Sequence, residues 1–287
     1  MRIGIDIGGS HIACGLIEKG EIIAKREKDF EKEDRKSIEK VIEKTIIDFT
    51  EEILKERNLK VSEIEKIGLA VPGTTKNGVI VKAENLGIVN FKILEILSKH
   101  FDCKNIKLNN DAKCAGICEK EFGSLKNYDD CVFICLGTGI GGAVFLEGEL
   151  LKPKRYSGFE LGHMMIDKNG RKCNCGAYGC FETYASMKSL KDRIAIKKNN
   201  YNLSGKEIYQ IIKDDRELEE ILEEFIQDLN IGLSNIINIF EPEAICIGGG
   251  FIHYKDLLLD RLINKMYETK LTFNNDFPII LTAKMRK

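Results

Sequence analysis

The fold class is decided by the stretch Arg2-Ile-Gly-Ile-Asp-Ile-Gly-Gly-Ser-His-Ile-Ala-Cys-Gly-Leu-Ile17. Small and β-branched residues alternate over residues 2–7, the pair Gly8-Gly9 interrupts them, and a second apolar run covers residues 12–17. Apolar runs on either side of a glycine turn predict two strands with that turn between them.

The same pattern starts again at residue 131. An apolar run over 131–136 breaks at a second glycine turn, 137–142, and resumes over 143–146. Three further strands are expected where short apolar runs stop at Pro, Asn or Gly residues: 67–71, 106–108 and 244–247. Apolar spacing predicts helices over 37–57 and 217–240, and residues 112–122 are compatible with a helix. The doubled order predicts two similar α/β domains, residues 1–115 and 116–287, that meet at a cleft.

Composition excludes several classes of protein. Apolar residues make up 43% and charged residues 31% of the 287 positions, which suits a folded chain with a core. The 44 Lys and Arg residues balance 45 Asp and Glu residues and are dispersed, so neither a nucleic acid nor a membrane is expected as partner. The longest apolar stretches are too short to span a bilayer. With no basic-then-apolar leader before the first strand, the sequence predicts a soluble cytoplasmic protein.

Three glycine turns follow strands and are candidate nucleotide contacts, because glycine lets backbone amides converge on an anion. The first turn adds a hydroxyl and also a carboxylate that could hold hydrated magnesium. The second turn adds a hydroxyl. The third turn has no side chains that would exclude a flat nucleoside. Their residues are Asp6, Gly8, Gly9 and Ser10; Gly137, Thr138 and Gly139; and Gly248, Gly249 and Gly250. None is a lysine-containing P-loop. Any one of them alone would be read as a tight hairpin.

Asp111 is the candidate general base. It is expected where a strand ends and a helix begins, a position from which a carboxylate near bound phosphates can accept the proton of an attacking hydroxyl. The alternative is that Asp111 only caps the helix.

One histidine and three cysteines form a candidate metal site: His163, Cys173, Cys175 and Cys180. A Cys3His set suits a closed tetrahedral zinc site with a structural role, and a redox pair of cysteines is the main rival. The other seven cysteines are expected to be small buried hydrophobes in a reducing compartment. They are Cys14, Cys103, Cys114, Cys118, Cys131, Cys135 and Cys246.

Two glutamates, Glu160 and Glu182, bracket this cluster. Carboxylates held by one metal loop are well placed to accept hydrogen bonds from the hydroxyls of a small polyol, and a site of this kind rejects analogues that lack a hydroxyl. The alternative is that both are ordinary surface residues.

Together these motifs make the chain resemble the ROK family of repressors and sugar kinases. The resemblance rests on Ile5-Asp-Ile-Gly-Gly-Ser10, Val71-Pro-Gly73, Asn109-Asn-Asp-Ala112, Leu136-Gly-Thr-Gly-Ile-Gly-Gly142, Glu160-Leu-Gly-His163, Cys173-Asn-Cys-Gly-Ala-Tyr-Gly-Cys-Phe-Glu182 and Ile247-Gly-Gly-Gly250, which occur in the order of the family.

The resemblance implies two actin-like (ribonuclease H-like) ATPase domains around an interdomain cleft. It also implies ATP-dependent phosphorylation of a hexose or amino-hexose, usually at the 6-hydroxyl, by a homodimer that uses Mg²⁺ and a structural Zn²⁺. Asp111 then falls on the catalytic base, the first two glycine turns on the phosphates, the third on the nucleoside, and the Cys3His set on the zinc site. The implied sugar ligands are Gly73, Asn85, Asn110, Glu160, His163 and Glu182.

The chain departs from the family pattern at residues 277–287, where members usually continue into a final helix that packs on the first domain. A short natural form and a truncated chain both fit this ending. Two alternatives to a kinase stay open, a sugar-responsive repressor and a non-catalytic sensor. The repressors of the family carry a helix-turn-helix domain ahead of the kinase-like fold, whereas here the first strand is expected at residue 2. The motifs do not specify which sugar is bound.

Overall fold

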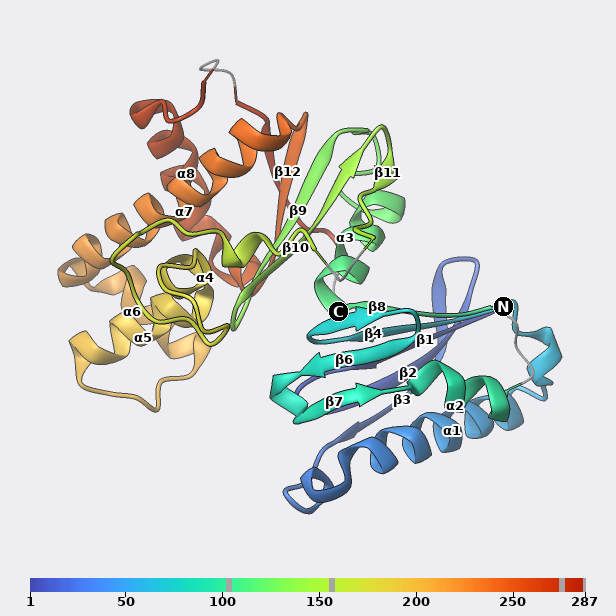
Figure 1. Ribbon diagram of the computed structural model, residues 1–287. Helices are drawn as coiled ribbons and strands as arrows, with labels where there is room; N and C mark the ends of the chain where they lie inside the picture. The colour runs from blue at the N-terminus through green and yellow to red at the C-terminus, as the bar shows by residue number, and fades with distance from the viewer. Residues whose placement is uncertain (102–104, 155–157, 274–276, 286–287) are drawn as a thin grey trace. The chain divides into compact units, whose positions relative to one another are not determined.

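The computed structural model describes residues 1–101, 105–154, 158–273 and 277–285 of the chain (Figure 1). The chain forms two compact units, Met1–Cys114 with Pro153–Gly158, and Ala115–Lys152 with Phe159–Lys287. The division falls inside helix α3 (Asp111–Phe122).

The first unit is built on a five-stranded sheet with the order β3-β2-β1-β4-β8. Strands β1, β2 and β3 pair antiparallel, whereas β1, β4 and β8 run parallel to one another. The carboxyl ends of these three parallel strands therefore share one edge of the sheet. The strand bounds are β1 Arg2–Ile7, β2 His11–Glu18, β3 Glu21–Asp29, β4 Lys66–Val71 and β8 Ile106–Asn110.

Helix α1 (Ile38–Glu56) contributes to the core of this unit because its apolar residues recur at helical spacing. Its Ile42, Ile46 and Ile53 side chains are fully buried among isoleucine and leucine residues of the sheet. A second sheet, with the order β5-β6-β7, and helix α2 complete the unit. The remaining elements are η1 Glu33–Ser37, η2 Val61–Glu63, β5 Thr74–Lys76, β6 Val79–Ala83, η3 Glu84–Leu86, β7 Ile88–Phe91 and α2 Ile93–His100.

The second unit repeats the plan around a sheet with the order β11-β10-β9-β12-β13. Strands β9 and β10 form an antiparallel pair, and β9, β12 and β13 run parallel, so the carboxyl ends of β9 and β12 share an edge. The strand bounds are β9 Cys131–Leu136, β10 Ile140–Leu146, β11 Glu149–Leu150, β12 Ala244–Gly249 and β13 Ile279–Thr282.

Helix α7 (Glu219–Phe240) is central to the core of the second unit, where its Phe225, Leu229 and Leu233 side chains are fully buried. The other helices of the unit are η4 Leu161–His163, α4 Glu182–Ala185, α5 Met187–Lys198, α6 Gly205–Asp214, η5 Arg216–Leu218, η6 Gly250–Tyr254 and α8 Lys255–Thr269.

The sequence predictions for individual elements agree with the structure to within a few residues. The largest difference is strand β10, which begins at Ile140, three residues before its predicted start, since the glycine turn is shorter than its sequence signature. Of the isolated cysteines, Cys14, Cys131 and Cys246 are buried and Cys103 lies outside the described residues. The prediction of full burial was wrong for three that are only partly buried: Cys114, Cys118 and Cys135.

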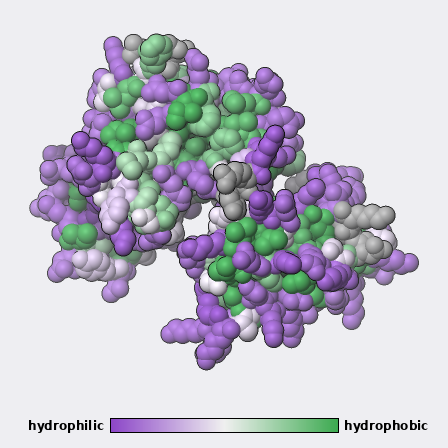
Figure 2. Space-filling view, viewed as in Figure 1, coloured by the Kyte–Doolittle hydropathy of each residue, from purple (hydrophilic) through white to green (hydrophobic). Residues whose placement is uncertain are grey.

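Figure 2 shows hydrophilic residues over much of the visible face, with hydrophobic side chains between them. Among the described residues, no helix combines the length and the apolar character that crossing a membrane requires.

Candidate functional site

In the first unit, the predicted site residues gather at the edge where β1, β4 and β8 end. Asp6 is near the end of β1, and Gly8 and Gly9 form the turn into β2, closed by the hydrogen bond from Gly8 N to His11 O (2.8 Å). Asp6 Oδ2 lies 3.9 Å from His11 Nε2. Ser10 is exposed, and its carbonyl accepts a hydrogen bond from Phe30 N.

Asn110 and Asp111 stand at the junction of β8 and α3, as the sequence predicts. Asn110, rather than Asp111, caps the helix: its Oδ1 accepts a hydrogen bond from Lys113 N (3.2 Å), and its Nδ2 donates to Gly73 O (3.1 Å). Asp111 is half-buried, and its Oδ1 accepts only the local bond from Ala112 N at 2.8 Å among the bonds described. The capping bond to Lys113 N is therefore made by Asn110, and the Asp111 carboxylate makes only the bond to its neighbour Ala112 N among the bonds described.

Asn85 lies in η3 and is exposed. Arg35, which the sequence analysis did not include, joins this segment to the first glycine turn. Its guanidinium donates to Asn85 O (2.8 Å) and to Gly9 O. The partners are backbone carbonyls, which every residue carries, so no residue-type signal in the sequence pointed to Arg35.

In the second unit, the other two glycine turns lie at one edge because β9 and β12 are parallel neighbours. Gly137–Gly139 join β9 to β10, with Gly137 N donating to Gly139 O (2.9 Å), and Thr138 is exposed. The third turn has a packing requirement of its own: Gly249 has a φ of +74°, and a Cβ there would lie 2.6 Å from Leu136 O. Glycine at 249 is thus demanded by the backbone whether or not a nucleoside binds there.

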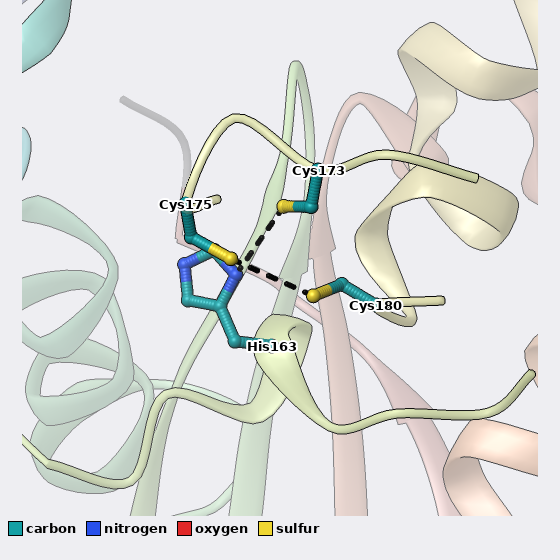
Figure 3. A group of neighbouring side chains, drawn as sticks. All are labelled: His163, Cys173, Cys175 and Cys180. Carbon is teal, nitrogen blue, oxygen red and sulfur yellow. Dashed lines mark hydrogen bonds between the residues drawn. The ribbon is translucent and has the colours of Figure 1, made fainter. Parts of the chain in front are cut away.

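The His–Cys cluster is held by a tight loop between two short segments. Cys173 N donates to Ala177 O (2.8 Å), and an isolated bridge pairs Met165 with Cys180. Phe181 is fully buried directly after Cys180, which fixes the end of the loop in the core. His163 ends the single turn η4, which positions its ring beside the loop (Figure 3).

The four side chains fit a tetrahedral metal site. Their ligand atoms all lie within 4.8 Å of one another, with Cys173 Sγ 3.8 Å from His163 Nδ1 and Cys175 Sγ 3.6 Å from Cys180 Sγ (Figure 3). A zinc–sulfur bond of about 2.3 Å places tetrahedral sulfur ligands about 3.8 Å apart, so the cluster already has nearly the required dimensions.

The thiols of the cluster differ in acidity. Burial raises the pKa of the Cys173 and Cys180 thiols, whereas the backbone amide of Ala177 lowers the pKa of the exposed Cys175 thiol. A metal ion binds the deprotonated thiolates, so metal binding must release the protons that burial keeps on the Cys173 and Cys180 thiols.

Glu182, the first residue of α4, contacts both the cluster and the glycine turn. Its Oε1 lies 3.2 Å from Cys173 Sγ and 3.7 Å from His163 Nδ1, and its Oε2 accepts a hydrogen bond from Ile140 N (3.3 Å). Glu160 precedes η4 and is exposed, and its carbonyl accepts a hydrogen bond from His163 N. Sequence reasoning placed Glu182 beside the metal loop but did not foresee its bond to Ile140.

Each unit therefore collects its own part of the predicted set. The first holds Asp6, Gly8, Gly9, Ser10, Gly73, Asn85, Asn110 and Asp111, and the second holds Gly137, Thr138, Gly139, Glu160, His163, Cys173, Cys175, Cys180, Glu182, Gly248, Gly249 and Gly250.

Comparisons of sequence and fold with known proteins point to one family. Glucokinase of Thermotoga maritima is 32% identical over 93% of this chain and 87% of its own length. The xylose repressor of Bacillus spizizenii is 31% identical over 91% of this chain and 67% of its own length. Among solved structures, the ROK family glucokinase from Streptomyces griseus in complex with glucose and AMPPNP superimposes with a TM-score of 0.78, at 24% identity, over 99% of this chain and 94% of that one.

The chain shares the two-domain, actin-like ATPase fold of the ROK sugar kinases. The ROK family model matches residues 2–287. By sequence and by fold, the chain belongs to the ROK family.

Proposed function

We propose that this protein transfers the γ-phosphoryl group of ATP to a hydroxyl of a hexose or amino-hexose, at its 6-position, with Asp111 as the general base. The observation that carries the proposal is that Asn110 and Asp111 make different contacts at the start of α3. Asn110 takes the capping position and accepts from Lys113 N, and Asp111 Oδ1 accepts the bond of Ala112 N, while the Asp111 carboxylate stays at the edge where β1, β4 and β8 end. The glucokinase relative supports a sugar-kinase activity.

Asp111 acts on the attacking hydroxyl. As the sugar oxygen forms its bond to the γ-phosphorus, its proton passes to the Asp111 carboxylate, the bond from phosphorus to the β,γ-bridging oxygen breaks, and ADP leaves. The base acts mainly by orienting the hydroxyl, because a phosphoryl-transfer transition state is stabilised largely by positioning and electrostatics.

In this proposal the hydroxyls of the sugar are bound by the residues that the family resemblance implies, which are Gly73, Asn85, Asn110, Glu160, His163 and Glu182. Polar groups that each pair with one hydroxyl discriminate by hydroxyl pattern, because an analogue lacking one hydroxyl leaves its partner unpaired.

The nucleotide is bound by the glycine turns. Amides of Gly8, Gly9 and Gly137–Gly139, with the Ser10 and Thr138 hydroxyls, bind the phosphates, and Gly248–Gly250 lie beside the nucleoside. Asp6 is the carboxylate that would hold hydrated Mg²⁺, which when bound neutralises charge on the phosphates.

The cluster His163, Cys173, Cys175 and Cys180 would hold a structural Zn²⁺. Four protein ligands leave no coordination position for water, so such an ion organises the loop and takes no part in the transfer. With Nδ1 directed to the metal site, the other ring nitrogen of His163 serves the sugar.

The test compares Asp111→Asn with a matched control, Asp48→Asn, on the exposed surface of α1 in the same unit. Loss of the base should lower kcat by about 10²- to 10⁴-fold while the sugar affinity, measured by calorimetry, stays within twofold of wild type. The control should match wild type in both. An Asp111→Asn enzyme with unchanged kcat would remove Asp111 from the mechanism.

A second candidate, a sugar-responsive regulator without kinase activity, is favoured by the xylose repressor relative. It predicts sugar binding with no transfer of phosphate from ATP to any hexose, and sugar-dependent binding to DNA.

A further inference from the structure

We propose that Glu182 couples the metal cluster to the glycine turn Gly137–Gly139, so that metal and nucleotide each strengthen the binding of the other. The inference rests on the proposed function, in which the cluster binds zinc and the turn binds phosphate. Glu182 is then a positioning residue for the nucleotide in addition to its proposed contact with the sugar.

One carboxylate reaches both sites. Glu182 Oε1 accepts the hydrogen bond of the Cys173 thiol at 3.2 Å and lies 3.7 Å from His163 Nδ1. Because a metal-bound Cys173 is a thiolate and cannot donate, the link that persists when metal binds is the short backbone from Cys180 to Glu182. Glu182 Oε2 accepts the hydrogen bond of Ile140 N, the first amide after the turn. Every one of these residues belongs to the second unit.

The backbone between the cluster and Glu182 is short and is fixed in the core by the residue between them. Only Phe181 separates Glu182 from Cys180, and the Phe181 ring is fully buried against helix α7, where a Cβ on Gly232 would lie 2.2 Å from it. A metal ion that fixes Cys180 therefore restricts the backbone of Glu182 as well.

The conformation of the turn Gly137–Gly139 depends on neighbouring residues, because two of its three residues have no side chain. Gly137 and Gly139 carry no side chain, and apart from its strand pairing the turn is held by Lys188 N, which donates to Gly137 O (3.2 Å), and by Glu182. Space at Gly139 is limited by the same carboxylate, since a Cβ there would lie 2.5 Å from Glu182 Oε2. An ordered Glu182 keeps Ile140 N, and with it the preceding amides, in one arrangement.

Thermodynamic linkage makes the coupling reciprocal. If bound metal raises the affinity for nucleotide by some factor, bound nucleotide raises the affinity for metal by the same factor. Coupling through a single hydrogen-bonded carboxylate belongs at the lower end of the usual range, about five- to twentyfold.

The experiment measures the Zn²⁺ affinity of the full chain by competition with a chelator, with and without saturating AMPPNP in excess Mg²⁺. A parallel titration measures the AMPPNP affinity of metal-loaded and metal-stripped protein. The variants are Glu182→Ala and Gly139→Ala, and the matched control is Gly68→Ala in β4, where a Cβ would meet no atom within 4 Å.

We expect AMPPNP to tighten Zn²⁺ binding by about five- to twentyfold in wild type and in Gly68→Ala, and by less than twofold in Glu182→Ala and Gly139→Ala. The ratio of affinities is the readout, so an overall loss of nucleotide affinity in a glycine variant does not alter the comparison.

The coupling is overturned if wild type shows no change, or if Glu182→Ala and Gly139→Ala keep the full change. These results leave the proposed function intact, provided that nucleotide and metal both bind. If wild type binds no nucleotide or no metal at all, the proposed function loses that part of its site, and the coupling falls with it.

Discussion

Replacing Gly232 by alanine sets two physical effects against each other inside helix α7. Alanine is favoured over glycine in a helix interior by about 1 kcal/mol. The added methyl group, however, would lie 2.2 Å from Cε2 and Cζ of Phe181, a ring with no solvent exposure. Overpacking of a dense core costs about 1–3 kcal/mol, and an overlap of this size against a ring with no space to move belongs at the upper end.

The balance predicts that Gly232→Ala lowers the free energy of unfolding by about 2 kcal/mol. The control is Gly205→Ala at the start of α6, where the nearest atoms to a Cβ are the flexible Lys191 Nζ at 3.4 Å and Tyr254 Oη at 3.5 Å. Gly205→Ala should leave stability unchanged or raise it by up to about 1 kcal/mol.

Urea denaturation followed by circular dichroism measures both variants. Because Phe181 lies between Cys180 and Glu182, Gly232→Ala should also release Zn²⁺ to a chelator faster than Gly205→Ala does. A second change, Phe181→Leu, should recover part of the stability lost in Gly232→Ala, since the two residues are in contact. A Gly232→Ala protein as stable as wild type would refute the packing described around Phe181.

Three further outcomes are expected. Ser204→Ala should lower the free energy of unfolding by about 1 kcal/mol in urea denaturation, because Ser204 Oγ accepts the hydrogen bond of Glu207 N at the start of α6, and Ser204→Asp should lose much less. Arg261→Gln removes the ion pair that lowers the pKa of Glu219, so it should cost less than about 1 kcal/mol at pH 7. Since that carboxylate is stabilised only while it is ionised, wild type and Arg261→Gln should converge as the pH falls below 4.5 and through the lowered pKa, and a difference that persists at pH 3 would contradict this cause. Cys180→Ser should reduce the bound zinc measured by mass spectrometry and lower the melting temperature. Cys118→Ser lies outside the cluster and should leave both of these quantities unchanged.

The sequence predicted those elements whose residues carry a clear period or a glycine stop. Helix α1 and helix α7 follow from apolar spacing, and β1, β9 and β12 follow from apolar runs that end in glycine. Strand β3 was missed because it lies at the sheet edge and only Ala24 of its residues is buried, so no alternation of apolar residues marks it. Strands β5, β6 and β7 were missed because they are only three to five residues long, too short for a clear alternation of apolar residues.

Several residues of the candidate site were recognisable because they directly follow a strand, as Gly8, Asp111 and Gly137 do, and chain order alone places such residues at strand ends. Their partners were less predictable. Asn110 instead of Asp111 caps α3, and Arg35 binds two backbone carbonyls, contacts that depend on the path of the backbone and leave no trace in residue type. The contact of Glu182 with Ile140 likewise arises from the pairing of β9 with β10, which brings the turn next to the metal loop.

Phosphate transfer itself tests the central claim most directly. The purified chain is incubated with Mg²⁺, ATP and, one at a time, glucose, fructose, mannose, N-acetylglucosamine and N-acetylmannosamine, and phosphorus–proton NMR locates the phosphate on any product. The account predicts stoichiometric formation of ADP and a 6-phosphorylated sugar from at least one of these hexoses. If the chain binds a hexose while every sugar stays unphosphorylated, the account of this protein as a sugar kinase is wrong.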